Sequence, residues 1–239
     1  LVYDARAGKV ISLNAEGTAP KLATIEWYKK NADGKIPAND TLLSASLPGI
    51  VDAWYLMLDR WGTMTLGELL QPAIELADNG FPISDALAGH INSTEKIRKY
   101  PTTSRIYLWD GKQRKGGDIL RNPDLARTLR MLVEAERQAS AQGRRAALKA
   151  ARDRFYKGDI ARAMAKFSEE NSGLYRYEDF AGYTAKFEEP VSVNYRGYDV
   201  YKNPSATQGP AELIVLNLLE GYDLKAMGRN SADFWHLLV

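Results

Sequence analysis

The sequence predicts an α+β fold in which helices dominate and a few strands are interspersed. Apolar residues recur at helical spacing over much of residues 50–167, whereas they alternate with a period of two near residues 191–200. Hydrophobic residues make up 45% of the 239 residues and charged residues 26%, which is ordinary for a globular protein. A chain of this length can bury a sizeable core.

Two β-hairpins are expected, one near each end of the chain. Residues 2–3 and 10–13 are strand-like and flank a polar turn. Residues 191–195 and 198–200 alternate around Arg196-Gly197, which predicts the second hairpin. A short helix through Trp27 follows the first hairpin.

Capping residues mark most of the helices between these hairpins. Pro48-Gly49 begins a helix that should end before Gly62, and Thr65-x-x-Glu68 forms a capping box for a second helix. The other expected boundaries are Gly80 as a helix end, Ser84 or Asp85 as a cap, Asn122-Pro123 as a start, Asp159 as a cap, and a final helix over 211–220 closed by Gly221.

Two stretches in the middle of the chain are harder to assign. Residues 106–109 are interpreted as a small strand that leads into a turn at Asp110-Gly111. Residues 137–154, rich in Ala, Arg and Gln, are expected to extend the helix that begins at Asn122.

The sequence shows no repeats and no Gly/Ser linker, so residues 1–239 are expected to form a single piece. The chain starts inside a strand-like run and stops inside an apolar helical pattern. We therefore expect it to be one piece of a longer polypeptide, incomplete at both ends.

Composition excludes several classes of function. The chain has 32 Lys+Arg and 30 Asp+Glu, so its net charge of +2 gives no general attraction to nucleic acid or anionic membranes. It has no cysteine, which excludes disulfides, thiol catalysis and iron–sulfur clusters. No apolar run approaches the roughly 20 residues of a membrane span, and no signal peptide is visible.

A search for catalytic motifs finds no active site in this chain. The two histidines, His90 and His236, are in no metal-ligand pattern, and the sequence has no nucleophile elbow, P-loop or dinucleotide fingerprint. The basic segment 111–117 is interpreted as a solvated turn rather than a phosphate cradle. The cluster of Arg and Lys at 144–154 is interpreted as a solvated helix face, because it lacks aromatic partners for nucleic acid.

Several segments, in the same order along the chain, resemble the γ-glutamyltransferase (γ-glutamyltranspeptidase) family over almost the whole length. These are residues 47–54 (LPGIVDAW), 70–83 (LQPAIELADNGFPI), 155–161 (FYKGDIA), 177–183 (YEDFAGY) and 216–224 (LNLLEGYDL). The resemblance implies an N-terminal nucleophile hydrolase with an αββα sandwich, to which this chain, as part of the large subunit, contributes mainly helices and a few strands.

In that family a precursor cleaves itself, and the new N-terminal Thr of the small subunit is the nucleophile, with its α-amine as base. The family's Thr-Thr-His motif is absent here, because Thr102-Thr103 is followed by Ser104. The resemblance therefore implies a partner small-subunit chain that bears the Thr, no catalytic residue in this chain, a small-molecule amide substrate, no metal or organic cofactor, and a periplasmic or extracellular location.

Substrate binding in this chain is assigned to Glu16 and Gly17. Family members that act on γ-glutamyl groups have an R-E-x-A-P segment, whose Arg pairs with the substrate's α-carboxylate. Counting back from Ala19-Pro20 places Glu16 at the Arg position. A carboxylate there would repel the substrate's carboxylate, whereas a guanidinium would bind it through two parallel hydrogen bonds. Arg6, ten residues away across the hairpin, is not expected to substitute.

Residues 203–210 also depart from the family's Ser-Ser-Gly-Gly loop, which changes specificity if the loop borders the site. Three functions stay open. The first is a γ-glutamyltransferase-like amidohydrolase or acyl transferase that works through an acyl-Thr intermediate, with altered specificity. The second is a true γ-glutamyltransferase or glutathione hydrolase, in which another cation replaces the Arg or the alignment shifts by one or two residues. The third is a catalytically inactive family member.

Overall fold

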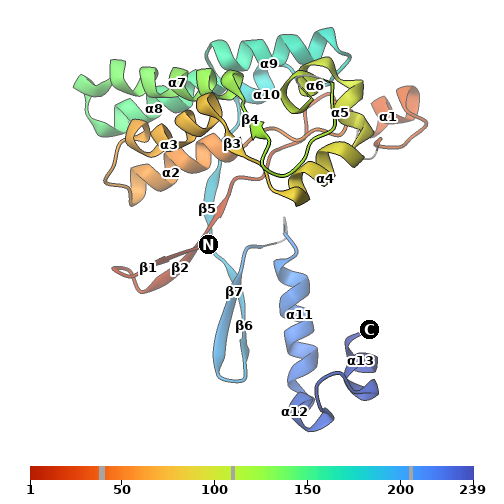
Figure 1. The fold of residues 1–239 in the computed structure, drawn as a ribbon. Helices are drawn as coiled ribbons and strands as arrows, with labels where there is room; N and C mark the ends of the chain where they lie inside the picture. Colours follow the sequence, from red (N-terminus) through yellow and green to blue (C-terminus); the bar gives the residue numbers. More distant parts are fainter. Residues whose placement is uncertain (38–40, 109–110, 205–206) are drawn as a thin grey trace. The chain divides into compact units, whose positions relative to one another are not determined.

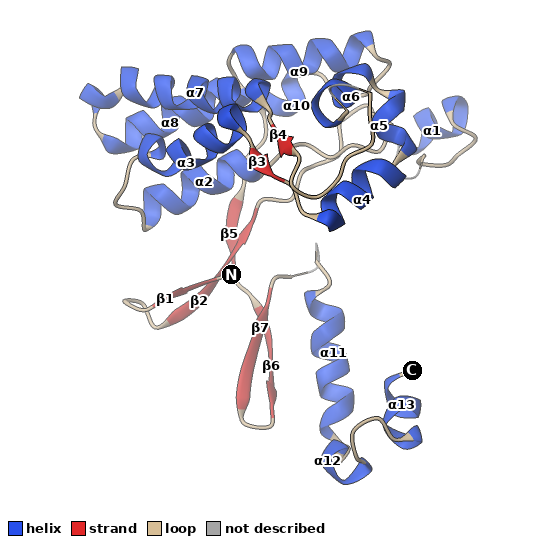
Figure 2. Cartoon of the chain, viewed as in Figure 1, coloured by secondary structure: helices blue, strands red, loops and turns tan. Residues whose placement is uncertain are grey.

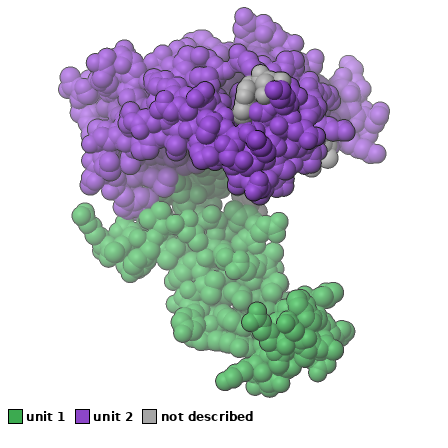
Figure 3. Space-filling view, in the orientation of Figure 1, with its two compact units in different colours: residues 1–16, 184–239 green, residues 17–183 purple. Residues whose placement is uncertain are grey.

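The computed structural model describes residues 1–37, 41–108, 111–204 and 207–239 (Figure 1). The chain divides into two compact units, each of which is described by itself (Figure 3). Unit 1 comprises Leu1–Glu16 and Thr184–Val239, and unit 2 comprises Gly17–Tyr183. Neither junction has a linker-like composition.

Unit 2 is built almost entirely of helices (Figure 2). Its helices are α1 (Ile25–Asn31), α2 (Ile50–Arg60), α3 (Leu66–Asn79), α4 (Asp85–Ser93), α5 (Glu95–Lys99), α6 (Pro101–Tyr107), α7 (Pro123–Gln138), α8 (Arg144–Tyr156), α9 (Asp159–Glu170) and α10 (Tyr177–Ala181). A short 3₁₀ turn, Ser140–Gln142, separates α7 from α8, and the strands β3 (Phe81–Pro82) and β4 (Ile119–Leu120) pair antiparallel.

Unit 1 holds the other strands and the last helices. Its elements are β1 (Val2–Asp4), β2 (Lys9–Asn14), β5 (Lys186–Glu188), β6 (Val191–Tyr195), β7 (Tyr198–Lys202), α11 (Gly209–Glu220), α12 (Leu224–Met227) and α13 (Ala232–Leu238). β2 is the central strand of a three-stranded antiparallel sheet and pairs with β1 and β5, with Ser12 opposite Glu188. β6 and β7 form a separate hairpin.

The core of unit 2 lies between α3, α7 and α8. Leu132 of α7 and Leu148 of α8 are almost completely buried. The buried carboxylate of Glu136, on α7, accepts hydrogen bonds from Leu66 N (2.7 Å) and Gly67 N (2.8 Å). Because the first N–H groups of a helix have no partner within the helix, a carboxylate at this end satisfies them and interacts favourably with the helix dipole. Glu136 therefore fixes α7 to the start of α3.

A buried ion pair joins α8 to α2. Arg152 Nε donates to Asp52 Oδ1 (2.7 Å), and its Nη2 also donates to Tyr183 O (2.5 Å). Tyr156 Oη donates to Pro48 O (2.7 Å) and accepts from Asp52 N (3.2 Å). Burial alone would lower the pKa of Arg152, but the hydrogen bond and charge of Asp52 raise it. The start of α2 is thus held by two side chains of α8, Arg152 and Tyr156, and by its own Asp52.

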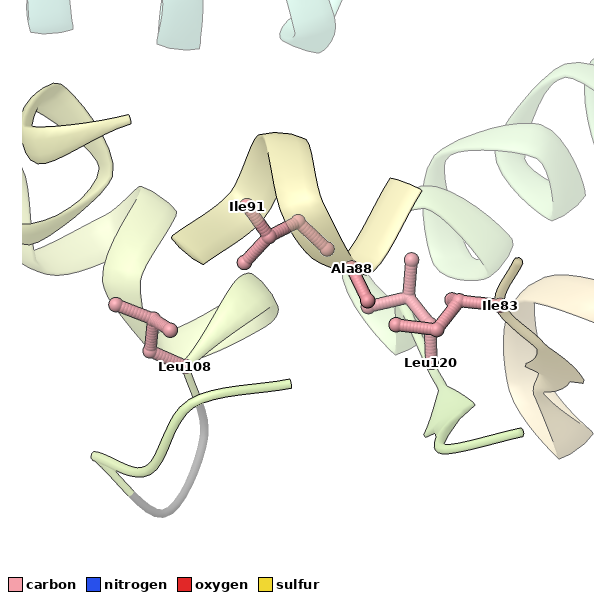
Figure 4. Close-up of a cluster of buried hydrophobic side chains, with 5 residues drawn as sticks. All are labelled: Ile83, Ala88, Ile91, Leu108 and Leu120. Atoms are coloured by element: carbon pink, nitrogen blue, oxygen red, sulfur yellow. The ribbon is translucent and has the colours of Figure 1, made fainter. Parts of the chain in front are cut away.

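A second apolar cluster in unit 2 lies around α4. Ile83, Ala88, Ile91, Leu108 and Leu120 are buried together (Figure 4). They come from β4, from α4 and the residue before its cap, and from the end of α6. This cluster explains why the small β3–β4 ribbon is retained in an otherwise helical unit, since Leu120 brings it into the core.

In unit 1, α11 lies against the β6–β7 hairpin and is tied to it at both ends. Lys202 Nζ pairs with Glu212 Oε2 at 2.6 Å, and Arg196 Nη2 donates to Tyr222 O at 2.7 Å. Few apolar side chains of α11 are buried. Leu213 is the only hydrophobic side chain that is buried among the described residues of unit 1.

Most of the predicted boundaries are confirmed. Both hairpins form, and the Thr65–Glu68 capping box, the Ser84 cap and the Asn122-Pro123 start are present. The helix-dominated α+β class is also confirmed. Gly209 begins α11 two residues earlier than expected, and Gly221 caps it.

Three local predictions are wrong. Residues 106 and 107 belong to helix α6, which begins with Pro101 at its first position, where the missing N–H costs nothing; Trp109 and Asp110 lie outside the described residues. Residues 137–154 were expected to extend α7, but α7 ends at Gln138, and Gly143 (φ 93°) adopts a conformation that side chains disfavour and precedes the separate helix α8. Gly158 caps α9, so Asp159 is its first residue.

Candidate functional site

Glu16, the first residue assigned to substrate binding, follows the end of β2 in unit 1. Its side chain is exposed. Its backbone N–H donates to Asn14 Oδ1 (3.1 Å), and Asn14 Nδ2 donates to Glu188 Oε2 on β5 (3.4 Å). The sheet therefore holds the main chain of Glu16 while its carboxylate faces the surface of the unit.

Gly17, the second assigned residue, begins unit 2 and is packed against backbone. A Cβ atom at this position would overlap the Leu47 carbonyl oxygen, so the close approach requires glycine. The next carbonyl, Thr18 O, accepts hydrogen bonds from Tyr175 Oη (2.7 Å) and from Leu47 N (3.3 Å). Residues 17–18 are thus attached directly to residues 45–47.

Two further groups hold the same segment. Tyr175 is buried, and its Oη also lies 3.1 Å from Ala45 O. Burial raises the pKa of Tyr175 to about 12, so its hydroxyl keeps the proton that it donates. The carboxylate of Asp179 accepts from Lys21 N (3.0 Å) and Arg176 N (2.9 Å). Sequence reasoning missed both residues, because nothing in a local pattern indicates a contact across some 160 positions.

The loop before α11 also contacts β2, within unit 1. Ser12 is fully buried, and its Oγ lies 3.1 Å from Asn203 Oδ1. Thr207 Oγ1 donates to Asn203 O and accepts from Gly209 N. Ser205 and Ala206 of the predicted specificity loop lie outside the described residues. The structure thus connects the base of this loop to the strand that leads to Glu16.

The other residues considered from sequence do not gather at this position. Arg6 lies in the turn between β1 and β2, at the opposite end of β2 from Asn14. His90 and His236 are exposed. Within the described part of the chain, no three His, Cys, Asp or Glu side chains are grouped so that they could hold a metal ion.

The two basic segments make contacts within the protein. Arg114 is buried, not solvated, and its backbone N–H donates to Asn92 Oδ1 (2.7 Å). In the same loop Gly116 N donates to Asp85 Oδ1 (3.1 Å), so carboxylates already use N–H groups that a phosphate would need. On α8, Arg145 pairs with Asp59, and Arg144 donates to Met64 O (2.6 Å). These cations join helices to one another.

The comparisons with known proteins place the whole chain in one family. The family model described as gamma-glutamyltranspeptidase matches residues 1–239. The glutathione hydrolase proenzyme of Escherichia coli (strain K12) is 33% identical and covers 100% of this chain, which spans 40% of that relative. The acylase ACY 1 proenzyme of Pseudomonas sp. (strain SE83) is 30% identical over 97% of this chain and 41% of the relative.

The crystal structure of the Helicobacter pylori γ-glutamyltranspeptidase superposes with a TM-score of 0.84 at 29% identity, and covers 99% of this chain and 64% of that one. The chain therefore belongs to the γ-glutamyltranspeptidase family, which is a family of N-terminal nucleophile hydrolases. It spans about 40% of the length of the curated relatives it matches. Helices long and apolar enough to cross a bilayer are absent from the described residues.

Proposed function

We propose that this chain is the large-subunit portion of a γ-glutamyltransferase-like amidohydrolase or acyl transferase. The match over residues 1–239 to a family with glutathione hydrolase and acylase proenzymes supports this proposal. Residues 1–239 are proposed to be a single piece of that subunit. The partner is a small subunit cut from the same precursor, and its N-terminal Thr is the nucleophile.

The proposed reaction has two steps. The Thr hydroxyl oxygen attacks the carbonyl carbon of the substrate amide while the α-amine of the same Thr takes the hydroxyl proton. The C–N bond breaks, the amine leaves with that proton, and an acyl-Thr ester is formed. Water or a second amine then attacks the ester carbonyl, the bond from the acyl carbon to the Thr oxygen breaks, and a proton of the attacking water or amine passes to the Thr oxygen, which releases a carboxylic acid or a new amide.

The specificity that we propose depends on one observation: an acidic residue, Glu16, stands where γ-glutamyl-specific relatives are expected to carry an Arg. With Gly17 it forms the part of the acyl-binding site that this chain supplies. A carboxylate at this position disfavours an acyl group that bears its own α-carboxylate. It favours an acyl group with an amine or another hydrogen-bond donor at that position.

Three anilides with the same leaving group test this proposal on the full self-cleaved enzyme. The γ-glutamyl anilide has an α-amine and an α-carboxylate, the glutaryl anilide has only the carboxylate, and the 4-aminobutanoyl anilide has only the amine. We expect the highest kcat/KM for the 4-aminobutanoyl substrate. Glu16→Arg should raise kcat/KM for the γ-glutamyl substrate by about tenfold or more, because a bidentate guanidinium–carboxylate pair replaces a repulsion.

Glu16→Gln is the matched control, since it removes the charge and keeps the size of the side chain. It should reduce the preference for the amine without creating a preference for the carboxylate. A wild-type enzyme that prefers the γ-glutamyl anilide would instead indicate a true γ-glutamyltransferase or glutathione hydrolase. The 33% identity to the E. coli glutathione hydrolase proenzyme favours that second candidate. A precursor that never cleaves itself would indicate an inactive family member.

We also propose a periplasmic or extracellular location, which family membership supports. Fractionation of cells that express the full precursor, with detection of the large subunit by antibody, tests this. Large subunit found only in the cytosolic fraction would contradict it.

A further inference from the structure

We infer that Asn14 is a positioning residue for Glu16, and that it acts by fixing the peptide plane that carries the Glu16 Cα to the end of strand β2. This inference rests on the proposed function, because it concerns the residue to which that proposal assigns the choice of substrate. All the contacts that support it lie within unit 1.

The Asn14 side chain joins Glu16 to the sheet through both ends of its amide. Asn14 Oδ1 accepts from Glu16 N at 3.1 Å, and Asn14 Nδ2 donates to Glu188 Oε2 at 3.4 Å. The first bond closes an Asx turn, in which a side chain binds the backbone two residues further on. Because an N–H needs an acceptor and a carboxylate needs a donor, these two neighbours require a side chain with one of each, and a primary amide supplies both. An aspartate here would face the Glu188 carboxylate with a second carboxylate.

The anchor of this amide is the pairing of β2 with β5. Asn14 is the last residue of β2 and lies opposite Lys186, while Ser12 lies opposite Glu188. Asn14 and Glu188 are therefore diagonal neighbours on one face of the sheet, within reach of each other's side chains. Lys186 Nζ pairs with Glu188 Oε2 at 3.2 Å, so a cation balances the charge of the anchoring carboxylate. The amide is thus held by two paired strands rather than by a loop.

The planarity of the peptide bond carries this restraint to Glu16. The atoms from the Ala15 Cα to the Glu16 Cα lie in one plane. One edge of that plane is attached to β2 through Ala15, and its N–H is held by Asn14 Oδ1. The Glu16 Cα is therefore fixed relative to β2, and rotations about its N–Cα bond and its side-chain bonds remain to direct the carboxylate. Loss of the Asn14 bond adds rotations at Ala15. The carboxylate then spreads over more positions, and its mean attraction for a substrate amine falls with the longer distances.

The test is a double-mutant cycle between Asn14→Leu and Glu16→Gln in the full self-cleaved enzyme. The readout is the ratio of kcat/KM for 4-aminobutanoyl anilide to that for glutaryl anilide. Leu resembles Asn in size and branching, and both are uncharged, so a change in the ratio does not come from a charge added or removed at position 14. We expect the ratio to fall about fivefold, which is the scale of one hydrogen bond. In the Glu16→Gln background Asn14→Leu should leave the ratio unchanged, since the charge that Asn14 positions is absent.

Two further substitutions at Asn14 make the test independent of one variant. Asn14→Ala removes the same two bonds without adding an apolar side chain, and should lower the ratio as far as Asn14→Leu does. Asn14→Ser keeps an oxygen that can accept from Glu16 N, because serine forms the same kind of turn more weakly. It should therefore recover part of the wild-type ratio, although it loses the bond to Glu188.

Asn194→Leu is the matched control, because Asn194 makes the same two kinds of bond elsewhere in unit 1. Its Oδ1 accepts from Gly197 N at 3.1 Å, and its Nδ2 donates to Asp199 Oδ1 at 2.8 Å. These residues lie at the turn end of the β6–β7 hairpin, whereas the segment after its other end contacts β2. Asn194→Leu should leave the substrate ratio at the wild-type value.

The outcomes separate this inference from the proposed function. If Glu16→Gln changes the ratio but Asn14→Leu and Asn14→Ala do not, the positioning role is overturned and the proposed function stands. Asn14 variants that lower the melting temperature and the rates for both anilides together, with the ratio unchanged, would show a structural role only and would also overturn it. If Glu16→Gln itself leaves the ratio unchanged, both the positioning role and the proposed specificity are overturned.

Discussion

The two units differ in how large a hydrophobic core each one has. In unit 2, buried polar groups such as Glu136 and Arg152 have partners within the unit, and leucines such as Leu132 are fully covered. In unit 1, Leu218 of α11 is 67% exposed and Trp235 of α13 is 52% exposed. Both units expose some large apolar side chains, but unit 2 has an extensive hydrophobic core, whereas Leu213 is the only buried hydrophobic side chain among the described residues of unit 1.

This contrast is consistent with a chain that spans about 40% of its relatives' length. An amphipathic helix in a finished domain buries its apolar face. α11 contains the run Leu213 to Leu219 and buries only Leu213 and Gly209. We propose that the remainder of the precursor covers α11 and α13, so that unit 1 is stabilised by association and unit 2 by its own core.

The largest expected effect is on the ion pair inside unit 2. Arg152→Ala leaves the Asp52 carboxylate buried without its main partner, and should lower the free energy of unfolding by about 3–5 kcal/mol. Arg145→Ala is the matched control, because Arg145 pairs with Asp59 at 3.1 Å but its side chain is 80% exposed. That variant should lose no more than about 1 kcal/mol. Urea titration of the two variants, followed by circular dichroism, measures both values.

Replacing both Asp52 and Arg152 shows whether the fold needs these charges, or whether Arg152→Ala destabilises it only by leaving the Asp52 carboxylate without a partner. Asp52→Leu combined with Arg152→Met should recover much of the stability that Arg152→Ala loses, because well-packed apolar groups often replace a buried pair without cost. A double variant as unstable as Arg152→Ala would instead show that the bonds to Tyr183 O and the start of α2 depend on these two residues.

A smaller effect is expected at the exposed face of unit 1. In the full processed enzyme, Leu218→Ser should lower stability by about 1–2 kcal/mol, since the remainder of the precursor would bury this side chain. Leu69→Ser, on α3 of unit 2, is the matched control with 44% exposure, and should change stability by less than about 0.5 kcal/mol. Denaturant titration of each purified two-chain enzyme provides the comparison.

Equal losses of stability in Leu218→Ser and Leu69→Ser would contradict the proposal that α11, and not α3, is covered by the rest of the protein. A large effect of Leu69→Ser alone would mean that α3, not α11, meets the rest of the protein. Either result would redirect the search for the subunit interface.

The sequence predicts much more of the local structure than of the site. Caps such as Thr65 and Asn122 act within one helical turn, so a pattern of a few residues reveals them. The end of α7 was missed because Ala and Arg favour helix on both sides of Gly143, and the glycine's positive φ is invisible in composition. Residues 106–107 looked strand-like because Ile and Tyr favour strands, but Leu108 and Ile106 pack into the cluster around α4.

Much less of the candidate site than of the local structure could be predicted from the sequence. Family resemblance led to Glu16 and Gly17, yet the groups that hold them come from distant positions. Tyr175 reaches Thr18 across 157 residues, and Ser12 reaches Asn203 across 191. The spacing of apolar residues along the sequence does not indicate such contacts between distant residues. The one local signal of the second contact is the position of Ser12 between Ile11 and Leu13 in a strand-like run, because a polar side chain inside a strand needs a partner when it is buried.

The smallest expected effect concerns alkaline pH and the buried hydroxyl of Tyr175 in unit 2. Burial raises the pKa of Tyr175 to about 12, whereas an unfolded tyrosine titrates near 10. The contribution of the buried neutral phenol is therefore complete below pH 10 and is lost as the pH rises from 10 to 12. The stability difference between wild type and Tyr175→Phe should shift by roughly 1 kcal/mol against wild type between pH 8 and pH 10.5. Urea titrations of both proteins at these two pH values measure the shift. A difference that stays constant would mean that the Tyr175 hydroxyl is open to solvent, which would contradict its burial against Thr18 O and Ala45 O.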